Sequence, residues 1–333
     1  MQSKLKLHIW PGKWTLPSWD PSCLAAVMFL QLSAPGLFSL VEDCNPDAST
    51  TGQFPYLQHG DGDDEQIYAP LSSIIQHVLS LSLPGVKSTS FAAGAPSQTA
   101  WITYAESALG DLVANTFYAL PTNWNSLTHP TLVETFPIPQ RFYSPFRIRD
   151  TYKQRLEAVD LWCLSGVELE EEAKKKSGSS FRENGKGKEK EKEEDFNPRY
   201  VFAKVFEREK ITEKARSTFT LLSRLLGSNP FFGDDDGSEP TLLDITIAAH
   251  ILLLLVPPFP DPLLRDLLNK SFPDLVAHAE RMRKLTLDTP GFPKAKKGDG
   301  EENGDVWLTR LRFGFFGIAV GGFAAHAYSV YSK

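Results

Sequence analysis

The order of apolar patterns in the first 85 residues is the feature that most limits how this chain can fold. Residues 5–9 alternate weakly and predict a strand, whereas residues 21–32 have the apolar spacing and first-turn proline of a helix. This order of strand, helix, strand and then strand, strand, helix predicts a small layered α/β domain over residues 1–87. The remaining elements are strands at 37–41, 54–57 and 66–68 and a helix that opens at Pro70 and ends near Pro84.

A helical period replaces the strand pattern after a small, polar stretch at 88–97, which we interpret as an interdomain linker. We expect an all-helical domain over 98–287, interrupted by a disordered insertion at 168–195. This insertion is rich in Lys and Glu and has almost no apolar residue to bury, although a docking element is the alternative. The expected helices are 98–120, 146–165, 199–226, 245–256, 261–268 and 273–285, with a proline-rich stretch at 130–145 and a hydrophilic linker at 288–305.

Thr241 and Asp244 have the spacing of a capping box. The Thr241 hydroxyl can accept a hydrogen bond from a first-turn amide, while Asp244 reaches back to the start of the helix. The helix that they cap, 245–256, is nearly all apolar. We therefore expect it at the centre of the helical core, with these two residues as a structural cap.

Charge and cysteine spacing exclude several functions. The chain has 333 residues and a formal net charge of -6, so it offers no basic field to nucleic acid. Cys23, Cys44 and Cys163 are widely spaced and form no C-x-x-C pair, which favours free thiols in a reducing compartment. The N-terminus lacks the charged and apolar regions of a signal peptide, so secretion is not expected.

Histidines and acidic runs do not predict a metal site. The seven histidines are scattered without an H-E-x-x-H pattern, and we interpret His250 as a satisfied core residue. The acidic runs at 60–65 and 234–237 lack the alternating ligand order of a calcium loop. We expect solvated turns there and no bound metal.

The C-terminus carries eighteen residues, 313–330, without a formal charge. This length is at the lower limit for crossing the hydrocarbon core, so we predict a C-terminal transmembrane helix within an anchor at 306–333; a buried core helix is the alternative. Arg310 and Arg312 precede the apolar stretch and would form its cytosolic flank, which leaves the body of the protein in the cytosol.

Small residues repeat at helical spacing inside the predicted anchor. Gly317, Gly321 and Ala325 would lie on one face of the helix. Such a face lets another helix or a barrel wall approach closely, so we expect a helix-packing face here.

The α/β unit followed by a helical domain with a capped central helix resembles the thioredoxin fold and the glutathione transferases. The expected fold class is a thioredoxin-like N-terminal domain plus an all-α glutathione-transferase-like C-terminal domain, with a C-terminal transmembrane helix.

The catalytic features of such enzymes are not matched by the residues. Cys23 has no second thiol to resolve it and lies on the core-facing side of its predicted helix, so we interpret it as structural rather than reactive. Ser18 and Ser22 are alternative nucleophiles, but a serine just before a helix is more often a cap. Ala69-Pro70 replaces the acidic-serine pair with which the transferase family holds glutathione. We expect no catalytic, cofactor-binding or metal residues.

Longer matches point to one family. They are LKLHIWPGKWTLPSWDPSCLAAVMFLQL, GQFPYL, YSPFRIRDTYKQRLEAVDLW and KARSTFTLLSRLLGSNPFFGDDDGSEPTLLDITIAAHILLLL. With these segments the chain resembles the metaxin family, in particular the fungal metaxin-like subunit of the mitochondrial sorting and assembly machinery.

The resemblance implies a non-enzymatic accessory subunit on the cytosolic face of the mitochondrial outer membrane. It would act with a β-barrel insertase and a second metaxin-like subunit, assist the insertion or release of imported barrel precursors, and link the import translocase to the insertase. The lipid bilayer is the remaining expected partner, and nucleic acid is not one. Two alternatives stay open, namely a membrane-anchored glutathione transferase-like enzyme and an outer-membrane tether or adaptor.

Overall fold

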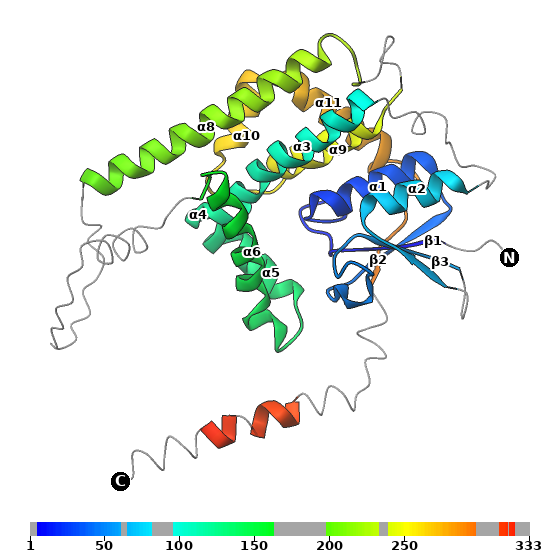
Figure 1. Ribbon diagram of the computed structural model, residues 1–333, viewed down its shortest axis with the longest axis vertical. Coiled ribbons are helices and arrows are strands. Elements are labelled where there is room, and N and C mark those ends of the chain that lie inside the picture. The colour runs from blue at the N-terminus through cyan, green and yellow to red at the C-terminus, as the bar shows by residue number, and fades with distance from the viewer. Residues whose placement is uncertain are drawn as a thin grey trace.

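The computed structural model describes residues 5–60, 65–81, 96–162, 198–232, 239–297, 313–318 and 320–323. Its first part is a layered α/β domain, in which two helices lie on the same face of a sheet (Figure 1). The elements are β1 Leu5–Ile9, α1 Pro21–Ser33, β2 Phe38–Glu42, the 3₁₀ turn η1 Pro46–Ala48, β3 Tyr56–His59, β4 Gln66–Tyr68 and α2 Leu71–Ser80.

The sheet has the order β4-β3-β1-β2-β5. Strand β1 runs parallel to β2 and antiparallel to β3, so that Leu7 pairs with both Leu40 and Leu57. All three leucines are fully buried. The fifth strand, β5 Lys296–Lys297, pairs with β2 after the chain has passed through the helical domain. The late segment of the chain therefore completes the edge of the early sheet.

Helix α1 is buried on nearly all of its sides. Nine of its thirteen residues are buried, because it packs on α2 within its own domain and on the central helix of the next domain. A helix that is apolar all round is stable only in such a fully enclosed position.

The second part is helical. Its centre is α9 Leu242–Leu255, which has twelve buried residues and contacts α1, α3 and α11. The elements around it are α3 Pro96–Ala114, the π-helical turns η3 Asn115–Ala119 and η4 Trp124–Thr128, α4 Pro121–Asn123, α5 His129–Thr135, the 3₁₀ turn η5 Gln140–Phe142, α6 Ser144–Ala158, α8 Pro198–Leu226, α10 Leu263–Ser271 and α11 Pro273–Thr286. The expected combination of a thioredoxin-like domain and a transferase-like helical domain is confirmed.

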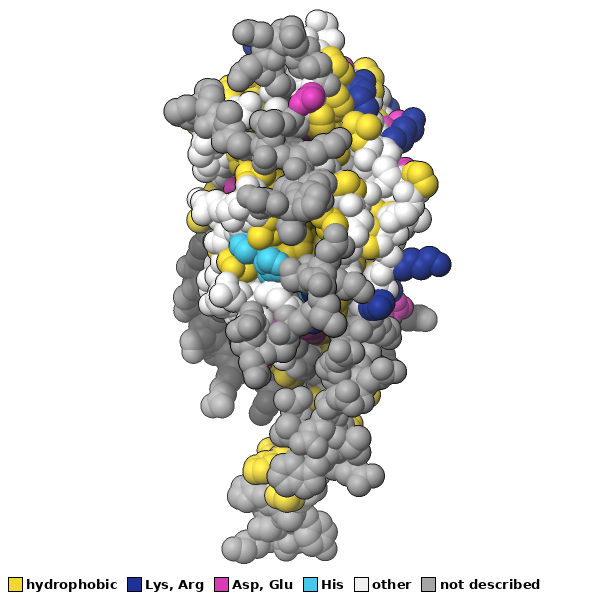
Figure 2. Space-filling model, turned by 90° about the vertical axis from the view of Figure 1, so that its right-hand side faces the viewer, with side chains coloured by type: hydrophobic (Ala, Val, Ile, Leu, Met, Phe, Trp, Pro, Cys, Tyr) yellow, Lys and Arg dark blue, Asp and Glu magenta, His cyan; other side chains and the backbone are white. Residues whose placement is uncertain are grey.

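The prediction of a C-terminal transmembrane helix is wrong. In the part of the chain that the structure describes, no helix combines the length and apolar character needed to cross a membrane. The described residues of the expected anchor are 313–318 and 320–323. They expose apolar side chains, seen as yellow patches at the lower end of the molecule in Figure 2.

The residues assigned to that anchor have few described contacts. A Cβ placed on Gly317 or Gly321 would meet no atom within 4 Å in the described part of the chain, and the packing face expected there stays a prediction. Arg310, Arg312 and Ala325 lie outside the described residues, as does the whole expected insertion at 168–195.

Candidate functional site

An open cavity of about 680 Å³ lies between the two domains. The thioredoxin-like domain contributes the start of α1, the residues before β3 and the start of α2. Helices α3, α6 and α9 form the opposite wall. Because it has walls from both domains and a mixture of apolar and polar side chains, the cavity is the candidate site for a small ligand.

The residues considered above as nucleophiles lie in the first turn of α1 and just before it, and of these Ser22 lines the cavity. Asp20 caps the helix, and its Oδ2 accepts a hydrogen bond from the Cys23 amide at 2.9 Å. Burial raises the pKa of the Cys23 thiol well above its ordinary value, and the negative charge of Asp20 raises it further. Cys23 is fully buried, so at neutral pH it is a protonated thiol without access to solvent.

The two serines differ in exposure. Ser18 is fully buried and its Oγ accepts a hydrogen bond from the Asp20 amide at 3.3 Å, which makes it part of the turn before α1. Ser22 is exposed and lines the cavity. Within the described residues no base contacts the Ser22 hydroxyl, so it has no activating partner.

The opposite wall carries one guanidinium group. Arg155 Nε donates to Asp111 Oδ1 at 2.7 Å, and Nη2 donates to the Ser107 carbonyl at 3.3 Å. The Asp111 side chain is only 6% exposed, so this pair compensates a buried carboxylate. A Cβ at Gly110 would lie 3.1 Å from Arg155 Nη2, which explains why the smallest residue occupies this turn of α3.

His250 lies behind Arg155 and is 5% exposed. Its Nδ1 lies 2.7 Å from the Thr246 carbonyl and therefore carries the proton of the neutral ring. Burial lowers the pKa of His250 to about 4. The hydrogen bond to the Thr246 carbonyl raises this pKa, and the charge of Arg155 lowers it. A neutral imidazole with such a low pKa is a weak base at neutral pH.

Two tyrosines complete the inner surface. The rings of Tyr118 and Tyr152 stack with centroids 4.3 Å apart and planes 9° from parallel. Burial raises the pKa of both hydroxyls, and the charge of Asp20 raises both further. Neither hydroxyl is therefore ionised at neutral pH. Only the ionised form, a phenolate, could take a proton from a thiol, so neither tyrosine is a base at this pH.

The start of α2 offers little to a peptide carboxylate. Pro70 stands at the N-cap with no side-chain hydrogen bond, and its carbonyl accepts from the Ser73 amide at 2.9 Å. Neither Ala69 nor Pro70 has a side-chain donor, and proline has no backbone N–H. The position at which a transferase would hold glutathione is thus a tight apolar turn.

Two histidines that are far apart in the sequence meet on the surface of the thioredoxin-like domain. His59 Nδ1 and His77 Nε2 lie 2.9 Å apart and face each other, and the Tyr68 ring stacks on His77. Burial and the neighbouring His59 lower the pKa of His77. Over the described ranges no three His, Cys, Asp or Glu side chains are placed to hold a metal ion.

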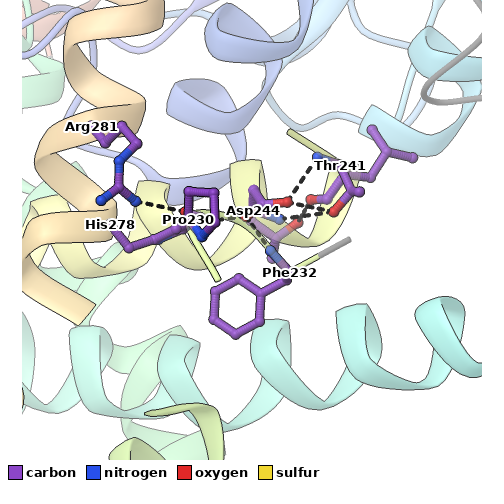
Figure 3. A network of polar contacts seen from close by, with 8 residues as sticks. Pro230, Phe232, Thr241, Asp244, His278 and Arg281 are labelled. Atoms are coloured by element: carbon purple, nitrogen blue, oxygen red, sulfur yellow. Dashed lines mark hydrogen bonds and ion pairs between the residues drawn. The ribbon is translucent and has the colours of Figure 1, made fainter. Parts of the chain in front are cut away.

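A second polar cluster lies in the helical domain and surrounds Asp244 (Figure 3). Asp244 Oδ1 accepts from the Phe232 amide at 2.8 Å and from His278 Nε2 at 2.7 Å, while Oδ2 accepts from Thr241 N at 2.8 Å and Thr241 Oγ at 2.6 Å. Asp244 and His278 are both fully buried. The structure therefore holds the cap residues Thr241 and Asp244 in a buried network that fixes the start of α9 and engages both carboxylate oxygens of Asp244.

Sequence patterns did not indicate the inner wall of the cavity. Arg155, Asp111 and His250 come from three helices, and only the fold brings them together. The one available signal is that Arg155 belongs to the YSPFRIRDTYKQRLEAVDLW segment, which carried the family resemblance.

Comparison with known proteins adds family information. Residues 23–149 match the family model described as outer mitochondrial membrane transport complex protein, and residues 215–282 match that of the glutathione S-transferase C-terminal domain. Metaxin-1 of Mus musculus is 27% identical over 255 residues, which are 77% of this chain and 67% of the mouse protein. Metaxin-1 of Homo sapiens is 26% identical over 77% of this chain, and the match covers 45% of the human protein.

Among solved structures, a glutathione S-transferase of Ceriporiopsis subvermispora in complex with glutathione is 14% identical, with 85% of this chain and 97% of that chain covered and a TM-score of 0.48. The element order and the match to the C-terminal domain define the class as a protein of glutathione-transferase-like fold. Within that class, the chain is similar to Metaxin-1 over about three quarters of its length and, over residues 23–149, to the outer mitochondrial membrane transport complex family.

Proposed function

We propose that this chain is a non-enzymatic accessory subunit of a protein transport complex of the outer mitochondrial membrane. The family matches support membership of such a complex. The observation that carries the non-enzymatic part is the state of Cys23, whose thiol lies in the first turn of α1, is fully buried and has a raised pKa. A scaffold whose candidate nucleophile is protonated and inaccessible is suited to binding rather than to conjugation.

The finer part of the proposal rests on the resemblance to metaxins. The subunit faces the cytosol and lies beside a β-barrel insertase and a second metaxin-like subunit. It assists the insertion or release of imported barrel precursors and contacts the import translocase.

Affinity purification of the tagged full-length chain from mitochondria in mild detergent tests this role. We expect stoichiometric recovery of an outer-membrane β-barrel protein and a second transferase-like subunit. Recovery of the chain as a monomer, in the detergent that keeps other outer-membrane complexes intact, would contradict the proposal.

A glutathione transferase is the second candidate, and the open cavity with Ser22 at its wall is the observation in its favour. Titration calorimetry with glutathione, alongside a conjugation assay with an aromatic electrophile, separates the two candidates. We expect neither binding nor turnover, and we expect a chain with Ser18, Ser22 and Cys23 all replaced by alanine to recover the same partners. Glutathione binding that the triple variant loses while remaining folded would favour the enzyme.

A further inference from the structure

One end of the helical domain exposes four large apolar side chains within residues 138–146. The exposed fractions are 50% for Ile138, 66% for Phe142, 46% for Tyr143 and 49% for Phe146. These four residues, here called the aromatic tip, come from the loop after α5, from η5 and from the start of α6. Helices α5 and α6 extend away from α3 and α9 in Figure 1, so the tip lies on a projection rather than in a groove.

The stretch of sequence that carries the aromatic tip is basic in a chain that is acidic overall. Between Glu134 and Asp150 the sequence contains Arg141, Arg147 and Arg149 and no acidic residue, whereas the whole chain has a formal net charge of -6. Arg147 is exposed and Arg141 is half-buried. The local charge is therefore opposite in sign to that of the protein as a whole.

Contacts at the base of the aromatic tip hold it in place. The Phe146 ring centroid lies 5.1 Å from that of His129 and 6.3 Å from that of Trp124. Arg149 Nε donates to the Tyr118 carbonyl at 3.0 Å, and its guanidinium lies 4.9 Å from the centroid of Trp124. The base of the tip is thus fixed to the helical core, and the exposed rings are presented by a rigid support.

We propose that the aromatic tip docks on an anionic lipid surface. Exposed apolar patches of this kind mark contacts with proteins or membranes, and three features favour the membrane. The tip projects, so that rings can enter a yielding surface without a matching groove. It combines aromatic side chains with arginines, the pair that settles at membrane–water interfaces. Its local positive charge complements anionic headgroups, which attract basic residues close to the bilayer.

The inference deepens the proposed function, on which it rests only for the identity of the membrane. In this arrangement the Phe142 ring and the Ile138 side chain enter the headgroup region, and the Arg147 guanidinium contacts lipid phosphate. The helical domain would then lie against the bilayer surface.

Vesicle flotation of the full-length chain tests the docking. The vesicles are phosphatidylcholine with or without phosphatidylserine, and the variant is the double substitution Ile138→Ser with Phe142→Ser. Phe206→Ser is the matched control, because Phe206 is 60% exposed on α8, away from the tip. We expect binding to anionic vesicles to fall about tenfold in the double variant and to stay unchanged in the control, because only the tip would lose buried apolar area.

Arg147→Gln separates charge from apolar contact. We expect it to weaken binding to anionic vesicles about threefold and to leave the weaker binding to neutral vesicles unchanged, because only anionic headgroups attract the guanidinium. Equal binding by wild type and the double variant to anionic vesicles would overturn the proposal.

A site-specific probe gives a second readout that does not depend on overall affinity. Phe142→Cys, in a chain with Cys44 and Cys163 changed to serine, accepts an environment-sensitive fluorophore, and Phe206→Cys serves as the control position. A blue shift on anionic vesicles at position 142 but not at 206 supports the docking, whereas no shift at 142 while the chain floats with the vesicles overturns it.

Loss of the copurified partners in the double variant, with vesicle binding intact, would assign the tip to a protein contact instead. Failure of the proposed function is recognised separately, by the absence of copurified partners with the wild-type chain.

Discussion

Two helix starts show how differently this fold uses a carboxylate. Asp20 caps α1 at the edge of the cavity, and Asp244 lies in the first turn of α9 within the helical core. Asp244 accepts four hydrogen bonds through its two oxygens and is fully buried. Asp20 Oδ2 accepts a hydrogen bond from the Cys23 amide. Burial raises the pKa of Asp20 more than hydrogen bonds from Cys23 and Ser22 lower it.

The two carboxylates have different consequences, because Asp244 stabilises the fold whereas Asp20 affects the protonation of a thiol. Around Asp244 every approach to the carboxylate is occupied by a donor of the chain itself, so the group stabilises one arrangement of three segments. At α1 a poorly compensated carboxylate lies beside the Cys23 thiol and helps to keep it protonated. A transferase needs the reverse, a positive potential at this helix start that stabilises a thiolate.

The same isosteric change at the two positions is the sharpest test, and Asp244→Asn should have the largest effect. An Asn side chain can accept only through its oxygen, so its amide would face donors that the carboxylate now satisfies. We expect the free energy of unfolding to fall by about 3 to 5 kcal/mol, as for other broken buried networks. Urea denaturation measures it, with Asp266→Asn in the exposed first turn of α10 as the control. A loss below about 1 kcal/mol would contradict a structural role for the network.

His250 extends the comparison to the pH dependence of stability. Because its folded pKa of about 4 lies below the ordinary value of 6.5, the unfolded chain binds a proton first as the pH falls. The stability that neutral His250 contributes is therefore present above pH 6.5 and is lost between that pH and about 4, by up to about 3 kcal/mol. Unfolding measured at pH 7 and pH 4.5 should show a smaller drop for His250→Gln than for the wild type. Equal drops in the two proteins would show that His250 does not titrate in this window.

Local patterns predicted the elements of the α/β domain closely. The strands expected at 5–9 and 66–68 have the observed bounds, and α1 ends one residue beyond its expected end at 32. In these elements the periodicity of the segment agrees with its tertiary surroundings. Helix α5, at 129–135, overlaps the stretch at 130–145 expected only as proline-rich. Pro130 is compatible with this helix because it lies in the first turn, where its missing N–H is not needed.

The features that the sequence did not predict depend on contacts between segments that are far apart in the chain. Strand β5 consists of two lysines inside the stretch expected as a linker, and only pairing with β2 makes it a strand. The three-residue spacing of Thr241 and Asp244 indicated a cap, but His278 joins Asp244 across 34 positions of sequence. No local pattern encodes such a partner, and the same holds for the Arg155 wall of the cavity.

Replacing Arg155 with methionine tests whether the inner wall is a structural pair. Asp111 would lose its guanidinium partner, and we expect the free energy of unfolding to fall by about 1 to 2 kcal/mol, because the half-exposed Arg155 leaves solvent to screen part of the charge. The pKa of His250 should rise, since the Arg155 charge now lowers it, but should stay below 6.5 because burial remains the larger cause. Imidazole NMR titration measures the shift. An unchanged pKa would show that the two groups are not coupled.

Asp20→Asn should have the smallest effect and completes the matched pair with Asp244→Asn. Asn is as good an N-cap as Asp and can keep the hydrogen bond from the Cys23 amide. Because the folded pKa of Asp20 is raised, its contribution to stability is present at low pH and is lost as the pH rises through that pKa, so the neutral side chain should cost less than about 1 kcal/mol at pH 7. The pKa of Cys23 should fall as the neighbouring charge disappears, yet it should stay above the ordinary value because burial is its first cause. Alkylation of Cys23 measured against pH, with peptide mass spectrometry as the readout, tests this expectation. Rapid reaction of the variant thiol at neutral pH would contradict it. Such a result would mean that a single substitution at the start of α1 is enough to produce a reactive thiolate.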